Sequence, residues 1–176
     1  MGTGRFVLRR AYSGWMHADV DIKPASVSDL VAVGGLRWDS LEENGGQPDD
    51  TRESFAARFA AWAAGHDSTH TCFVAVTTAD REVVGMAWLA VTLRVPSARA
   101  FDRASGDLQC AYVVPRLRDA GIGARLVLAV LERASALGLE RVTVHSSPGA
   151  VRFYERAGFA SEDVLLHATV TSQPHA

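Results

Sequence analysis

The segment YVVPRLRDAGIGARL, residues 112–126, decides the fold of this sequence. An apolar strand ends at Pro115, a polar turn follows, and Gly121-Ile122-Gly123 leads into a helix with an apolar stripe. Glycine lets the backbone approach a ligand closely, and the first N–H groups of a helix have no acceptor within it. The helix dipole adds partial positive charge at this end. With Arg116 and Arg118 beside these donors, the segment predicts a phosphate-binding turn.

The turn lacks the two sequence patterns that are typical of nucleotide and dinucleotide sites, which reduces the number of candidate phosphate ligands. A nucleotide P-loop requires Gly-Lys-Ser/Thr, but Gly123 is followed by Ala124-Arg125. A dinucleotide fingerprint requires a third glycine near position 126, which is Leu126. A nucleotide-binding switch would also need a lysine or a metal-binding carboxylate, and neither is in place. Glycine spacing alone remains compatible with a tight strand-to-helix turn that binds nothing.

Outward from this turn, the chain predicts one α/β domain. The segments 71–77 and 82–93 are expected to form an antiparallel hairpin, and strand, helix and strand from 108 to 145 a parallel β-α-β crossover. The sheet is therefore expected to be mixed, mostly antiparallel and flanked by helices. Expected helices run from Ser26 or Ser28 to Trp38 or Leu41, from Thr51 to before Gly65, along Ile122–Leu137 and over Ala150–Arg156. Expected strands are Val20–Pro24, Thr71–Thr77, Glu82–Leu93, Leu108–Val114, Val142–His145 and Val164–Val170.

The composition is that of an ordinary globular protein, with 48% hydrophobic and 22% charged residues. A formal net charge of -2 gives no electrostatic footprint for nucleic acid or a membrane surface. Cys72 and Cys110 are expected to be buried reduced thiols, and no Cys/His cluster predicts a metal site. No apolar run is long enough to span a membrane, and the N-terminus lacks the apolar region of a secretory signal, so we expect a cytoplasmic protein.

The domain is expected to cover residues 19–171, because periodic patterning begins near Asp19. Residues 1–18 are expected to be a disordered leader or a tag remnant, and residues 172–176 a tail. The last expected strand, Val164–Val170, can pair across a homodimer.

Two segments in order resemble the GNAT superfamily of acetyl-CoA-dependent N-acetyltransferases. The family's pyrophosphate motif, Gln/Arg-x-x-Gly-x-Gly/Ala after Val-x-Pro, is matched by Val113-Val114-Pro115 and Arg118-Asp119-Ala120-Gly121-Ile122-Gly123. RVTVHSSPGAVRFYERAGF, residues 141–159, resembles its second segment, with a Tyr-x-x-x-Gly-Phe ending at Tyr154. The family often has glycine at position 119 and asparagine at position 147, where this chain has Asp119 and Ser147. We expect Asp119 to point outward and to lower the affinity modestly.

The resemblance, which spans residues 20–170, implies that the chain binds acetyl-CoA and transfers its acetyl group directly to an amine. The cofactor would lie on residues 118–124 with Arg116, and Ser147 would contact its pantetheine arm. A backbone N–H near Val113 or Val114 would polarise the carbonyl. Tyr154 would act as the general acid, because a phenol can protonate a departing thiolate. The alternative is that Tyr154 and Phe153 form a core-facing aromatic pair on this helix.

The general base has two candidates. Asp107 aligns with a glutamate that some family members use, and Gln109 shares its face of the strand if no bulge intervenes. His145, at the end of a strand, is a rival because its unperturbed pKa suits base chemistry. Several family members need no dedicated base.

The acceptor, a small-molecule or peptide amine, would bind between the first two helices and the loop after the third strand. The candidate lining residues are Trp38, Glu42, Glu43, Phe55 and Trp88, with Gln109 as an orienting group. The same resemblance permits another function, a non-catalytic acyl-CoA-binding or regulatory protein with this fold.

Overall fold

The computed structural model describes residues 19–161 and Ala168, which divide into two compact units at His145 and Ser146. The first unit holds a sheet with strand order β1-β2-β3-β4-β5. Antiparallel pairing joins β1 through β4, and β4 pairs with β5 in parallel, as the sequence predicted. The strands are β1 (Val20–Pro24), β2 (His70–Thr77), β3 (Val83–Arg94), β4 (Arg103–Val113) and β5 (Val142–Val144).

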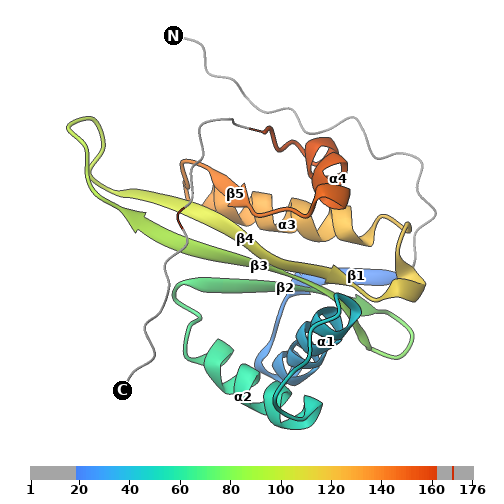
Figure 1. Cartoon of the computed structure of the whole chain (residues 1–176). Coiled ribbons are helices and arrows are strands. Elements are labelled where there is room, and N and C mark those ends of the chain that lie inside the picture. The colour runs from blue at the N-terminus through green and yellow to red at the C-terminus, as the bar shows by residue number, and fades with distance from the viewer. Residues whose placement is uncertain (1–18, 162–167, 169–176) are drawn as a thin grey trace. The chain divides into compact units, whose positions relative to one another are not determined.

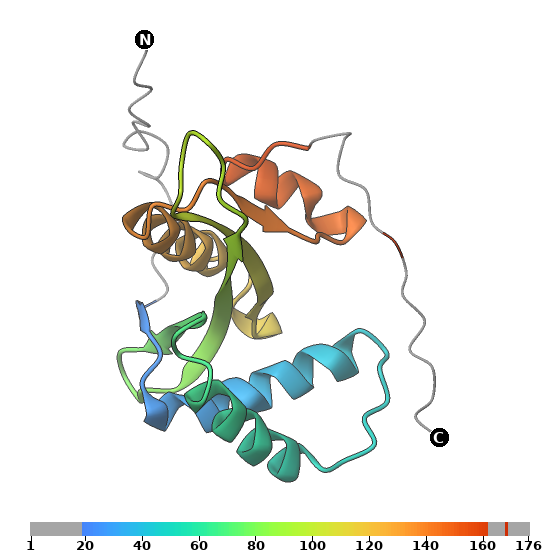
Figure 2. The ribbon, with the colours of Figure 1, turned by 90° about the vertical axis from the view of Figure 1, so that its left-hand side faces the viewer.

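Three helices cover the two faces of this sheet. Figures 1 and 2 show α1 (Leu30–Glu43) and α2 (Arg52–Ala64) on one face and α3 (Ile122–Ala136) on the other. Short 3₁₀ turns at Val27–Asp29 and Pro115–Leu117 precede α1 and α3. In the described part of the chain, no helix combines the length and the apolar character that crossing a membrane requires.

The amphipathic pattern of α3 explains how it packs on the sheet. Ile122, Leu126, Val130 and Ala134 are all buried, at the helical spacing that the sequence predicted. Leu137, which follows the last residue of α3, is instead 42% exposed. Gly138 then adopts a φ of 67°, the left-handed conformation that stops helices.

The helices α1 and α2 approach each other closely at a glycine. A Cβ atom on Gly34 would lie 2.8 Å from the Cα of Ala56. One turn after Gly34, Trp38 is buried and its ring lies 5.8 Å from that of Phe55. This crossing brings Trp38 of α1 and Phe55 of α2 close together on the same side of the sheet.

Strand β4 begins earlier than the sequence predicted and contains an irregularity. It starts at Arg103 rather than Leu108, so the β3–β4 connection is short. Met86 pairs with Tyr112 but Trp88 pairs with Gln109, which leaves one extra residue in β4. Cys110 lies in this bulge with a φ of 52°.

The second unit, described by itself, contains a 3₁₀ turn at Pro148–Ala150 and the short helix α4 (Val151–Arg156). The ring of Tyr154 packs edge-on against Phe153 and Phe159, at centroid distances of 5.0 and 5.6 Å. Gly158 ends the segment with a φ of 98°. The predicted strand Val164–Val170 lies outside the described residues except for Ala168.

Candidate active site

The edge of β4 beyond Leu108 faces no neighbouring strand among the described residues. The parallel pairing with β5 ends at Leu108 and Val144, while β4 continues to Val113. The Val114 N–H donates to the Val84 carbonyl at 2.9 Å, so Val84 and Val114 form a hydrogen-bonded pair. The adjacent pair, Gly85 and Val113, is then non-hydrogen-bonded, and the Val113 N–H points away from β3. Two N–H groups, those of Val113 and Val114, were predicted to polarise the carbonyl. Only the Val113 N–H is directed away from β3, because the Val114 N–H is already bound to the Val84 carbonyl.

The turn after β4 presents a row of backbone donors. Gly121 caps α3 with a φ of 76°, and no side chain caps this end of the helix. Among the described residues, none of the N–H groups of residues 119–124 has a recorded acceptor. The Ile122 side chain is buried, so only its backbone can face a ligand. The segment therefore offers a cluster of free donors at the positive end of a helix.

Asp119 occupies a strained backbone position in this turn. Its φ is 63°, in the left-handed region that glycine adopts without steric cost. Aspartate is one of the few other residues that visit this region, because its short polar side chain can form local hydrogen bonds. The residue is exposed.

Both arginines of the turn are engaged in ion pairs. Arg116 donates to the Glu82 carboxylate at 2.5 Å. Arg118 donates from both terminal nitrogens to Glu43, at 2.5 and 2.7 Å, and from Nε to the Val113 carbonyl at 2.9 Å. A cofactor phosphate must therefore share these guanidinium groups with the carboxylates or displace them.

Glu43 is the centre of a small network that joins α1 to the turn. The Tyr112 hydroxyl donates to its carboxylate at 3.1 Å, and the Arg118 guanidinium lies 5.3 Å from the Tyr112 ring centre. The hydrogen bonds from Arg118 lower the pKa of Glu43. Burial, with the hydrogen bond to Glu43, raises the pKa of Tyr112. The family resemblance made Glu43 a candidate for lining the acceptor site; in the structure its carboxylate pairs with Arg118 of the turn.

Asp107 lies on the α1–α2 face of β4, and two neighbours orient its carboxylate. The Gln109 amide donates to it at 2.8 Å, which confirms that both residues share a face, because the bulge comes after Gln109. The Thr143 hydroxyl, from the adjacent strand, donates at 3.4 Å. His145 directly follows β5 and is exposed, and no hydrogen bond to it is recorded within the described residues.

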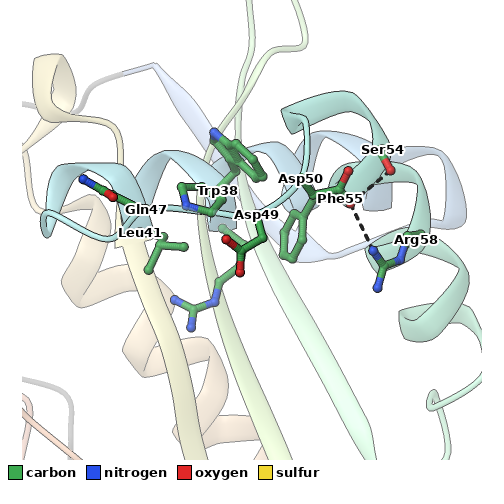
Figure 3. A pocket seen from close by; sticks show the side chains of 10 residues that line it. Trp38, Leu41, Gln47, Asp49, Asp50, Ser54, Phe55 and Arg58 are labelled. Carbon is green, nitrogen blue, oxygen red and sulfur yellow. Dashed lines mark hydrogen bonds and ion pairs between the residues drawn. The ribbon is translucent and has the colours of Figure 1, made fainter.

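A cavity of about 720 Å³ opens between α1, α2 and the loop that joins them (Figure 3). Trp38 and Phe55, both predicted at the acceptor site, line it. Glu42, Glu43, Trp88 and Gln109 are not among its lining residues. Trp88 is instead buried beneath α2, where its ring meets that of Phe59 edge-on at 5.7 Å. The polar lining was not predicted from the sequence and comprises Arg37, Gln47, Asp49, Asp50, Ser54 and Arg58.

The two cysteines differ in their surroundings, which corrects the expectation that both are buried. Cys72 is buried and Cys110 is exposed at the bulge. Both are free thiols. Within the described residues, no group of three or more His, Cys, Asp or Glu side chains is arranged to hold a metal ion.

Tyr154 and Ser147 belong to the second unit. Burial raises the pKa of the Tyr154 hydroxyl, which keeps it protonated at neutral pH. Ser147 is exposed, and its carbonyl accepts the N–H of Ala150 at 3.0 Å.

Three solved structures illustrate the likeness in fold. A Trypanosoma brucei acetyltransferase is 22% identical, with a TM-score of 0.66 over 86% of this chain and 100% of its own. A predicted acetyltransferase from Clostridium acetobutylicum, solved with acetyl-CoA, is 15% identical, with a TM-score of 0.72 over 89% and 99%. Glucosamine-6-phosphate N-acetyltransferase from Arabidopsis thaliana is 16% identical, with a TM-score of 0.66 over 86% and 99%.

The sequence comparisons complete this result. None of the curated proteins matches the chain. The model of the acetyltransferase (GNAT) family matches residues 33–159, which include β4, the glycine turn and Tyr154. The chain therefore belongs to the acetyltransferase (GNAT) family.

Proposed function

We propose that this protein is an N-acetyltransferase that moves the acetyl group of acetyl-CoA directly to a primary amine. The family uses acetyl-CoA, which supplies the acetyl group as a reactive thioester. The observation that carries the proposal is the Val113 N–H, directed toward the open edge of β4 and followed by the free donors of residues 119–124. One donor suits a carbonyl oxygen and the row of donors suits a pyrophosphate, so the residues present fit the cofactor.

Each binding residue of the turn has a role in this proposal. The N–H groups of residues 119–124 hold the pyrophosphate, and Arg116 and Arg118 add positive charge. Ser147 donates to the pantetheine arm. The Val113 N–H donates to the carbonyl oxygen as negative charge develops there, a contribution of about 3 kcal/mol for one such donor. Val114 contributes only its side chain and backbone shape, because its N–H is bound to Val84.

Proton transfer is assigned to two side chains. Asp107, held by Gln109 and Thr143, takes the proton from the acceptor ammonium, directly or through water. His145 is the alternative base. Tyr154 gives its proton to the departing thiolate, and its raised pKa ensures that the proton is present over the neutral range.

The acceptor is proposed to bind in the cavity lined by Trp38 and Phe55. Its volume lies within the range of small-molecule sites, and aromatic walls with a few polar groups are typical of them. The cavity belongs to α1 and α2, which pack on the same face of the sheet as Asp107.

The test is an acceptor screen with Tyr154→Phe as the central variant. The expected result is acetylated product from at least one amine, with kcat about 100-fold lower in Tyr154→Phe and unchanged acetyl-CoA affinity. Phe153→Leu, which alters the neighbouring ring and keeps the hydroxyl, serves as the control for packing of α4. Tight acetyl-CoA binding with no product from any amine would instead favour a non-catalytic acyl-CoA-binding protein.

A further inference from the structure

The far ends of β3 and β4 form a hairpin that extends beyond the other strands of the sheet (Figure 1). Antiparallel pairing of β3 with β4 continues to Arg94 and Arg103, whereas β2 pairs with β3 only as far as Ala90. The outer edge of β4 is covered further, because the Ala104 carbonyl accepts the Glu140 N–H at 3.0 Å. The edge of β3 beyond β2 is therefore the open edge of this hairpin.

The backbone groups of Leu93 lie on this open edge. The Val91 N–H donates to the Thr69 carbonyl at 2.8 Å, and among the described residues no backbone hydrogen bond to this edge is recorded beyond it. Backbone groups alternate in direction along a strand, so the N–H and C=O of Leu93 point the same way as the Val91 N–H, away from β4. Free backbone groups on an edge strand are a place where another strand can pair.

The same hairpin exposes a cluster of apolar side chains, which we call the hairpin tip: Leu93, Val95 and Phe101. They are 85%, 84% and 79% exposed, more than any other large hydrophobic residue that the structure describes. Single exposed apolar residues are ordinary on a protein surface, but three of them around one turn are a feature of interaction sites. Covering them would remove apolar surface from water, which is favourable.

Hydrogen bonds hold the hairpin tip in one conformation. Arg103 donates to both carboxylate oxygens of Glu140, at 2.5 and 3.0 Å, and to the Val95 carbonyl at 3.0 Å. At the turn, Ser97 and Ala100 exchange two backbone hydrogen bonds, at 2.8 and 3.2 Å. A surface that is already ordered loses less conformational entropy when a partner binds to it.

The charges of the hairpin permit a second copy to approach. Edge strands are often protected from pairing by a free charged side chain, but Arg94, between Leu93 and Val95, lies 3.7 Å from the carboxylate of Glu140. Arg99 and Asp102 carry opposite charges, and no ion pair of either is recorded among the described residues. In a two-fold arrangement, the positive group of one copy can approach the negative group of the other.

We propose that two copies of this chain form a homodimer by antiparallel pairing of their open β3 edges, about a two-fold axis near Arg94. An antiparallel pair of identical strands has such an axis, so every contact occurs twice. The Leu93 backbone of each copy pairs with Val95 of the other, and the apolar side chains of the two hairpin tips cover one another. The proposal is independent of acetyl transfer.

Two features of β3 limit where this pairing can occur. On one side, Thr69 already occupies the edge at Val91. On the other side, Pro96 has no N–H to donate. The free edge is therefore short and centred near Arg94. This surface is separate from the segment 164–170, whose predicted strand lies outside the described residues except for Ala168.

The test measures the mass of the full chain in solution. Sedimentation velocity is recorded from about 1 to 200 µM, because a short interface of this kind is expected to have a micromolar Kd. A reducing agent is present, so that exposed Cys110 cannot join two copies through a disulfide. The wild-type protein is expected to approach twice the 18.9 kDa of one chain as its concentration rises.

Two matched variants assign the contact to the hairpin tip. Leu93→Glu places a carboxylate from each copy in the interface and is expected to raise the dimer Kd about 30-fold or more. Val27→Glu makes the same change at a residue that is 77% exposed in the turn before α1, and should leave the Kd unchanged. At about 1 µM, both variants should unfold at the wild-type temperature, because both substituted side chains are exposed.

Amide hydrogen exchange gives a second measurement, one that reports on the backbone. Peptides that contain Leu93 and Val95 are expected to exchange more slowly at high protein concentration than at low concentration. The Leu93→Glu variant should show no such difference, and peptides of α3 should show none in either protein.

Three results would overturn the proposal. A wild-type protein that stays a monomer at 200 µM has no such interface. A dimer that persists unchanged in Leu93→Glu, or that Val27→Glu weakens equally, pairs through another surface. A dimer without slower exchange at Leu93 and Val95 does not use the β3 edge. Each of these results leaves the proposed acetyl transfer in place.

Discussion

At the scale of single residues, Asp119 is expected to limit the affinity of the proposed site for acetyl-CoA. Its backbone adopts the left-handed conformation that glycine provides most easily, and its carboxylate lies in the turn proposed to bind a pyrophosphate. The residue is exposed, so solvent screens its repulsion of the phosphates. We therefore expect aspartate at this position, in place of the family's common glycine, to lower the affinity for acetyl-CoA while still allowing the turn to form.

We predict that Asp119→Asn binds acetyl-CoA about two- to fivefold more tightly, because it removes the charge and keeps a side chain that tolerates positive φ. Asp119→Gly should bind at least as tightly and unfold at a higher temperature, since glycine meets no steric penalty there. Calorimetric titration at low and high salt measures the effect, and the gain should shrink as salt rises. Unchanged affinity in both variants would place the carboxylate away from the phosphates.

The two thiols should be distinguishable by their reactivity. Cys72 is buried in the apolar core between the sheet and α1, and burial raises its pKa strongly. Cys110 as a whole residue is exposed at the bulge. Partial burial of its thiol group nevertheless raises its pKa.

We predict that a thiol reagent modifies Cys110 alone in the folded protein, and Cys72 only after unfolding. Because a raised pKa leaves less thiolate at neutral pH, the rate at Cys110 should be slow near pH 7 and increase as pH rises. Mass spectrometry of the modified peptides identifies the site, and Cys110→Ser supplies the blank. Rapid modification of Cys72 in native conditions would contradict the packing of this core.

At the scale of elements, the close crossing of α1 and α2 determines where the cavity forms. We predict that Gly34→Ala lowers the free energy of unfolding by about 1–3 kcal/mol, because the new Cβ would lie 2.8 Å from the Ala56 backbone. The crossing must widen, and the spacing of Trp38 and Phe55 changes with it. Chemical denaturation measures the loss.

Gly65→Ala is the matched control, since this glycine ends α2 with a negative φ and a Cβ would lie 3.6 Å from its nearest neighbour, the carbonyl oxygen of Trp62. Its unfolding free energy should stay equal or rise by up to about 1 kcal/mol. Equal effects of the two substitutions would mean that the contact between α1 and α2 does not limit stability.

The sequence predicted those elements whose patterns are local. The apolar spacing of α3 and the glycine turn before it are both legible in neighbouring residues. The first part of β4 was missed because Ser105, Gly106 and Asp107 are typical of a loop. In the structure Gly106 is a strand residue packed closely against its neighbours, since a Cβ there would lie 2.8 Å from the Cδ1 atom of Leu89 and would have to displace that side chain. The ion pair of Glu43 with Arg118 joins residues 75 positions apart, and no local pattern contains such information.

At the scale of the whole first unit, the Glu43–Arg118 pair connects the helix that lines the proposed acceptor cavity with the turn proposed to bind the cofactor. Leu41 lines the cavity, and Glu43 follows it by two residues at the end of the same helix. A pyrophosphate that binds Arg118 would have to share its guanidinium with the Glu43 carboxylate or displace that carboxylate. We therefore expect acetyl-CoA binding to weaken the ion pair between Arg118 and Glu43 of α1. This effect can be measured as a dependence of the acetyl-CoA affinity on the protonation of Glu43.

We predict that Glu43→Gln binds acetyl-CoA about two- to fivefold more tightly than the wild type at pH 7, because Arg118 no longer has a competing carboxylate. In the free protein, Arg118 holds the pKa of Glu43 below its ordinary 4.5. Once the phosphates engage Arg118, this pKa returns toward its ordinary value, so the complex binds more protons than the free protein as pH falls through that range. Binding to the wild type should then tighten relative to Glu43→Gln as pH falls below 4.5, and the two affinities should converge once Glu43 is protonated in the free protein as well as in the complex. Calorimetric titrations between pH 7 and pH 4 test this, and weaker binding by Glu43→Gln at pH 7 would show that Glu43 orients Arg118 for the phosphates instead of competing with them.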